Sequence, residues 1–165
     1  MAAGNTYVAI ATQTLGSAAA SVTFSSIPGT YTDLVLVCNT IAAGAQNILL
    51  RFNSDTGTNY SYTRLIGDSA GATSARESSI NQLNLYRASA NLNNQRVTTI
   101  LQIMNYSNTT TYKTMISRGA AGAEETNAQV SLYRSTSAIT SLVFDVFTTN
   151  FSAGSTFSLY GVLNA

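Results

Sequence analysis

Polar and apolar residues alternate along much of this chain with a period of two. Residues 21–25 (Ser-Val-Thr-Phe-Ser) show it most clearly, because their apolar side chains fall on one face, as in a half-buried β-strand. Residues 33–38 (Asp-Leu-Val-Leu-Val-Cys) form a short continuous apolar run instead, which is typical of a strand covered on both faces or at one end of a sandwich core. The pattern predicts strands rather than helices.

Further segments carry the strand signal and are separated by turn sequences such as Pro28-Gly29 and Asp55-Thr56-Gly57. With the two above, the predicted strands are residues 7–11, 21–25, 33–38, 47–53, 60–66, 80–87, 96–106, 112–118, 128–134, 139–147 and 156–162. We therefore expect an all-β fold, an antiparallel β-sandwich that is jelly-roll-like, with about eight to eleven strands. At most one short helix is expected, between Ala72 and Gln82.

The sequence contains no linker-like stretch, so it predicts a single β-sandwich domain over residues 13–165. Residues 1–12 precede it as an N-terminal segment that is either an arm or the first strand. Within that segment, Tyr7, Val8 and Ile10 are candidate assembly contacts with a neighbouring subunit or shell. The competing interpretation is that they belong to the first edge strand.

Composition removes several classes of function. The chain has no His, which excludes the usual serine and cysteine hydrolase triads, and a single Cys, which excludes an internal disulfide or a multi-thiolate metal site. Its eight basic residues are spread singly and the net charge is +1, so no basic patch for nucleic acid is expected. No apolar run approaches the length needed to span a membrane. We expect no enzyme activity, no cofactor, no nucleic-acid partner and no membrane partner.

Three local patterns each allow a chemical and a structural interpretation. Residues 53–59 (Asn-Ser-Asp-Thr-Gly-Thr-Asn) offer oxygen ligands to Ca²⁺ but hold one carboxylate, so a β-turn without metal is preferred. Tyr60 and Tyr62 share one face of a strand and either stack on a glycan or pack across strands. Cys38 is expected to be a small buried hydrophobic residue, and no pair of acids suggests catalysis by carboxylates.

Residues 11–36, residues 50–62 (Leu-Arg-Phe-Asn-Ser-Asp-Thr-Gly-Thr-Asn-Tyr-Ser-Tyr) and residues 157–162 (Phe-Ser-Leu-Tyr-Gly-Val) carry a resemblance. In these segments the chain resembles small β-sandwich virion proteins of tailed bacteriophages, several of them from marine or cyanobacterial hosts. The resemblance implies a head-decoration, head-fibre or tail-appendage protein, often a homotrimer, and it transfers no catalytic residue.

These observations favour a non-enzymatic capsid decoration (cement) protein that binds the head surface as a homotrimer. The expected partners are itself and the major capsid protein or other virion proteins, and the expected location is the virion's capsid surface after assembly in the host cytoplasm. Ser, Thr and Asn make up 58 of 165 residues and charged residues only 9%, so few ions must leave water when subunits pack together. The alternative is a tail-fibre or tail-tip module that recognises host-surface glycan through Tyr60 and Tyr62.

Overall fold

The computed structural model describes residues 6–42, 47–87, 95–121 and 125–163. These residues contain twelve strands and no helix, which confirms the prediction of an all-β fold, with one strand more than expected. The strands are β1 (Tyr7–Thr14), β2 (Ser21–Phe24), β3 (Asp33–Ile41), β4 (Asn47–Phe52), β5 (Tyr60–Asp68), β6 (Gly71–Ile80), β7 (Leu83–Arg87), β8 (Arg96–Met104), β9 (Lys113–Ala121), β10 (Glu125–Tyr133), β11 (Leu142–Val146) and β12 (Thr156–Val162). Across the described part of the chain, no helix has the length and apolar character to span a bilayer.

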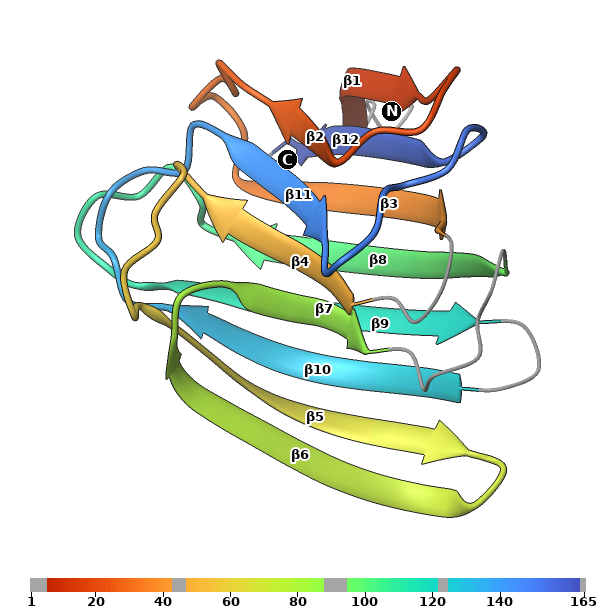
Figure 1. The fold of residues 1–165 in the computed structure, drawn as a ribbon. Coiled ribbons are helices and arrows are strands. Elements are labelled where there is room, and N and C mark those ends of the chain that lie inside the picture. The colour runs from red at the N-terminus through yellow and green to blue at the C-terminus, as the bar shows by residue number, and fades with distance from the viewer. Residues whose placement is uncertain (1–5, 43–46, 88–94, 122–124, 164–165) are drawn as a thin grey trace, which may run out of the picture.

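The strands form two sheets of unequal width, packed face to face (Figure 1). The large sheet has eight strands in the order β1-β12-β3-β8-β9-β10-β5-β6, and the small sheet has four in the order β2-β11-β4-β7. Every neighbouring pair is antiparallel. The β-sandwich prediction is therefore confirmed.

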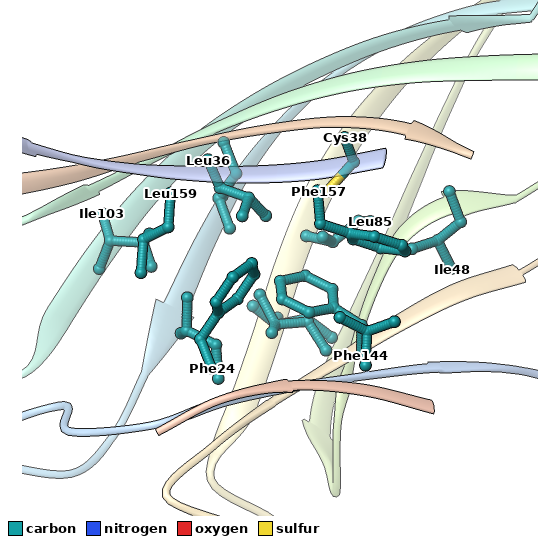
Figure 2. Packing of buried hydrophobic residues seen from close by; sticks show 14 of the residues in the cluster. Phe24, Leu36, Cys38, Ile48, Leu85, Ile103, Phe144, Phe157 and Leu159 are labelled. Atoms are coloured by element: carbon teal, nitrogen blue, oxygen red, sulfur yellow. The ribbon is translucent and has the colours of Figure 1, made fainter. Parts of the chain in front are cut away.

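The core lies between the sheets and is built from the inward positions of alternating strands. In β3, every second residue is buried, and the same alternation recurs in β8, β10 and β12. Aromatic rings bridge the layers: the centroid of Phe144 in β11 lies 5.6 Å from that of Phe157 in β12 (Figure 2). Cys38 is buried in this cluster, as predicted, and its burial raises the pKa of the thiol.

The small sheet is too narrow to cover the large one. Its edge strand β7 contacts β5, β9 and β10, and the hairpin of β5 and β6 extends beyond it (Figure 1). Residues 71–79 of β6 are consequently exposed on both faces.

The prediction of a short helix between Ala72 and Gln82 is wrong, because this segment forms most of β6. The sequence signal failed there for a physical reason. A strand exposed on both faces has no apolar side to bury, so it lacks the alternation that reveals the other strands.

Candidate functional site

The outward side of the large sheet is a broad surface that no described element covers. Along β8, β9, β10 and β5, buried inward residues alternate with exposed or half-buried outward ones. We call the outward-facing residues of β5, β6, β8, β9 and β10 the open face. It is the strongest candidate for a functional surface because an exposed sheet face of this size is available for packing against a partner.

Three large aliphatic side chains gather at the centre of the open face. Val130 of β10 is 59% exposed and lies opposite Ile116 of β9, which is 51% exposed. Leu65 of β5, which is 64% exposed, lies opposite Ala128, two residues from Val130 along β10. Since directly opposite and diagonal cross-strand neighbours are within side-chain reach, the three form one exposed aliphatic cluster.

Small residues hollow the open face around this cluster. A hollow of about 340 Å³ includes Thr63, Arg76 and Val130 in its lining. Two others, of about 310 and 280 Å³, lie on either side of Thr126, where Gly119 and Gly67 provide no side chain. At Gly67, an added Cβ would meet the hydroxyl of Thr126 at 3.3 Å, so glycine helps to keep the hollow open.

The charge on the open face is of one sign. Arg76 and Arg118 are exposed, and neither forms an ion pair or hydrogen bond with the described residues. Arg96, at the start of β8, is also exposed, but it donates hydrogen bonds to Asn39 and to the carbonyl of Gly154. The outward positions of these five strands, all within the described residues, hold no Asp or Glu. On β6 the acid Glu77 lies opposite the buried Tyr62, so the register assigns it to the other face of the sheet, although it is among the residues that line the hollow beside Arg76.

The inward side of β5, β9 and β10 is polar, unlike the apolar core beside it. Arg64 is 1% exposed, and its Nε donates a hydrogen bond to Oε1 of Gln129 over 2.8 Å. A guanidinium nitrogen also donates to the carbonyl of Asn84 in β7, and the guanidinium lies 4.7 Å from the ring centre of Tyr62. These contacts tie the two sheets together, so we interpret Arg64 as a structural residue. The sequence analysis did not single it out, although its spacing from Tyr60 and Tyr62 places it on their face.

Tyr60 and Tyr62 share one face, as predicted, but that face is interior. Tyr60 is fully buried and stacks on Tyr133 with ring centroids 4.8 Å apart, and Tyr62 is 6% exposed. Burial and the neighbouring Tyr133 raise the pKa of Tyr60. Neither ring is available to stack on a sugar, so the prediction that these residues contact glycan is corrected, and cross-strand packing accounts for both.

Tyr7, Val8 and Ile10 lie in β1, the edge strand of the large sheet, where β1 pairs with β12. Ile10 packs against the core, whereas Tyr7 is 60% exposed. The described part of the N-terminal segment therefore belongs to the sandwich, and residues 1–5 lie outside the described residues. The role of these three residues as assembly contacts stays a prediction.

The turn at residues 53–59 is organised by its own side chains. The carboxylate of Asp55 accepts hydrogen bonds from the amide of Gly57 at 2.7 Å, from Nδ2 of Asn59 at 2.8 Å and from the hydroxyl of Tyr133 at 2.9 Å. These bonds, that of Asn59 first, hold the pKa of Asp55 below its usual value. Among the described residues, no group of three or more Cys, Asp or Glu side chains is placed to hold a metal ion.

The only lysine of the chain, Lys113, is fully buried at the start of β9. Its Nζ donates hydrogen bonds to the carbonyls of Thr111 at 2.7 Å and Thr136 at 3.2 Å. Burial lowers its pKa. These contacts join β9 to the segment after β10. Because the only lysine is buried, the basic side chains on the described surface are all arginines.

Comparisons with known proteins give little. No protein-family model matches the chain, and no curated protein matches it. Among solved structures it is similar to a marine PL-14 alginate lyase from Aplysia kurodai, with a TM-score of 0.29, 9% identity and coverage of 96% of this chain and 82% of the lyase. It is also similar to a legume lectin-like domain from Entamoeba histolytica, with a TM-score of 0.27, 14% identity and coverage of 98% and 86%. Likenesses this weak carry no argument about function.

Proposed function

We propose that this chain is a non-enzymatic structural protein of a tailed-bacteriophage virion, a capsid decoration (cement) protein that binds the head surface as a homotrimer. The location on a virion rests on the resemblance of residues 11–36, 50–62 and 157–162 to small virion proteins. The mode of action, adhesion through a broad protein surface, rests on the open face.

The observation that carries the proposal is the uncovered outward side of an eight-stranded sheet. The five strands of the open face, spaced about 4.8 Å apart, cover a width of about 24 Å, and nine-residue strands make the face about 30 Å long. The resulting face of about 700 Å² is comparable with the roughly 800 Å² that each partner contributes to a standard protein interface. The open face therefore has enough area for a stable contact.

The chemistry of the open face suits adhesion better than catalysis. Its outward residues are mainly Ser, Thr, Ala and aliphatic side chains, so docking removes few charges from water. Three copies in one trimer would multiply a modest affinity per face, provided that all three can reach the shell together.

Copy number tests this function most directly. Quantitative mass spectrometry of purified particles, calibrated on the major capsid protein, should find the chain at hundreds of copies in multiples of three. A few copies per particle would instead indicate a tail component, and absence from particles would refute the proposal. A glycan array run in parallel tests the tail-module alternative, which no longer has Tyr60 and Tyr62 in its support.

A further inference from the structure

Two arginines flank the aliphatic cluster of the open face. Arg76 of β6 begins a row of residues that runs across the sheet, in which each residue lies opposite the next. The row continues through Thr63 of β5 and Val130 of β10 to Ile116 of β9. Arg118 of β9 lies opposite Ala128, and Ala128 lies opposite Leu65. The aliphatic side chains therefore occupy the area between the two guanidinium groups.

The register fixes how far apart the two charges lie. Arg76 and Arg118 are three strands apart and offset by two residues, which places their Cα atoms about 16 Å from each other. Each lines one of the hollows, Arg76 that of about 340 Å³ and Arg118 that of about 310 Å³ beside Gly119. Arginine is enriched and lysine depleted in protein interfaces, and the buried centre of an interface is more apolar than the rest of the surface.

The positive charge of Arg76 and Arg118 determines which kind of partner fits the open face. A second copy laid face to face would present the same arginines and the same acid-free positions, so its charges would repel rather than match. A nucleic acid or an anionic polysaccharide would satisfy the arginines but would leave Leu65, Ile116 and Val130 without an apolar counterpart. A folded protein surface can supply both kinds of group.

We infer that the open face docks on a partner protein that presents two carboxylate groups, one for Arg76 and one for Arg118, around an apolar patch that covers Leu65, Ile116 and Val130. This inference rests on the proposed function, in which that partner is a protein of the virion shell. Arginine binds a carboxylate through two parallel hydrogen bonds, so the two pairs would fix the orientation of the docked subunit as well as its affinity.

The test uses particles that have been stripped of the chain and then incubated with purified protein at increasing salt concentrations, with bound protein measured by sedimentation. Arg76→Gln and Arg118→Gln should each weaken binding about tenfold at low salt and reduce its dependence on salt, because each removes one charged pair. Val130→Ser should weaken binding without changing the salt dependence.

Thr73→Glu is the matched control. Thr73 is exposed on β6 but opposite Ile66, so it lies on the other face of the same strand, and the substitution changes the net charge by the same amount as Arg76→Gln. It should bind within about twofold of the wild type, since its charge points away from the docked surface. Circular dichroism of all four variants checks that they are folded.

The outcomes separate the two proposals. If the wild type neither occurs in particles nor rebinds to them, the proposed function fails. If the wild type rebinds and each of the two arginine variants binds as tightly as the wild type, the inference about carboxylates is wrong while the proposed function stands. Two other results would also overturn the inference: binding of the wild type to double-stranded DNA as tight as to particles, or self-association in the ultracentrifuge that Val130→Ser abolishes.

Discussion

The hydroxyl of Tyr133, the last residue of β10, donates a hydrogen bond to the carboxylate of Asp55 over 2.9 Å. Asp55 lies in the turn between β4 and β5, so this bond joins the large sheet to the turn through which the chain crosses from the small sheet. The same carboxylate accepts hydrogen bonds from Gly57 and Asn59. An ionised carboxylate can accept all three bonds at once.

We expect Asp55→Asn to lower the free energy of unfolding by about 1–3 kcal/mol at pH 7, because an amide cannot accept all of these bonds. The pKa of Asp55 is below its ordinary value of 3.8 in the folded state, chiefly because of Asn59. The stability it contributes is therefore complete above about pH 5 and is lost as the pH falls through the unfolded and then the folded pKa. Between pH 5 and 2, urea unfolding should show that the free energy of unfolding falls less for Asp55→Asn than for the wild type. An equal fall in both proteins would contradict this account.

Tyr133 should make the fold sensitive to alkali. Burial, and then the bond to Asp55, raises the pKa of Tyr133 from 10.0 to about 12. Above pH 10 the unfolded chain loses this proton while the folded chain keeps it, so stability falls between pH 10 and 12. Tyr133→Phe should be less stable than the wild type at pH 7. Between pH 9 and 12, however, its free energy of unfolding, measured with urea, should fall less than that of the wild type. A parallel decline in wild type and variant would show that Tyr133 is not responsible.

Gly161 is predicted to be intolerant of any side chain. A Cβ at this position of β12 would lie 2.2 Å from Cγ of Tyr31, so the ring occupies the space above the glycine. Gly161→Ala should destabilise the protein by more than about 2 kcal/mol in thermal unfolding, because a core has little room to adjust. Gly16→Ala, where nothing lies within 4 Å, is the control and should change stability by less than about 0.5 kcal/mol.

Coupling between the two positions distinguishes a local clash from a general weakness of β12. In a Tyr31→Ala background the obstructing ring is gone, so Gly161→Ala should cost much less than it does in the wild type. Additive losses in the double variant would mean that the ring of Tyr31 is not what excludes the side chain.

The strands that sequence analysis located are those that bury one face. Eleven predicted segments overlap with strands of the structure because residues such as Val22 and Phe24 alternate with polar neighbours. β6 was missed because it is exposed on both sides, and the order of strands within the sheets depends on long-range pairing that no local pattern contains.

The candidate surface was harder to predict than the fold. A period of two shows that Tyr60 and Tyr62 share a face but does not say whether that face is turned inward, so the sequence leaves both glycan stacking and cross-strand packing open, and only the burial of the two rings decides between them. Val130, Ile116 and Leu65 come from three different strands and meet only through the register of the large sheet. The sequence did contain one usable signal. Arg64 follows Tyr60 and Tyr62 at an interval of two residues, so it had to lie on the same face of the strand as these two tyrosines.

Arg64 is predicted to be essential for stability. Its guanidinium supplies hydrogen bonds to the buried amide oxygen of Gln129 and to the carbonyl of the half-buried Asn84. Arg64→Ala should therefore destabilise the protein by about 3 kcal/mol or more, by leaving the buried acceptor of Gln129 unpaired and a cavity in the interior. Arg64→Met, which keeps most of the volume, should cost less, so urea unfolding of the pair separates the two contributions. A loss below about 1 kcal/mol for Arg64→Ala would show that Arg64 does not hold the sheets together.

The two interpretations of the N-terminal segment make different predictions for a deletion of residues 1–12. As an edge strand, β1 pairs with β12 from Tyr7 to Thr14, and Ile10 and Ala11 pack on the core. The deletion should then lower the free energy of unfolding by about 3 kcal/mol or more, since several ladder hydrogen bonds and apolar contacts are lost together. Tyr7→Ser keeps the backbone pairing and removes only an exposed ring, so it isolates the arm interpretation. If β1 is solely an edge strand, Tyr7→Ser will leave stability, trimerisation and head binding unchanged; if Tyr7 reaches a neighbouring subunit, trimerisation or head binding will weaken while the monomer remains as stable as before.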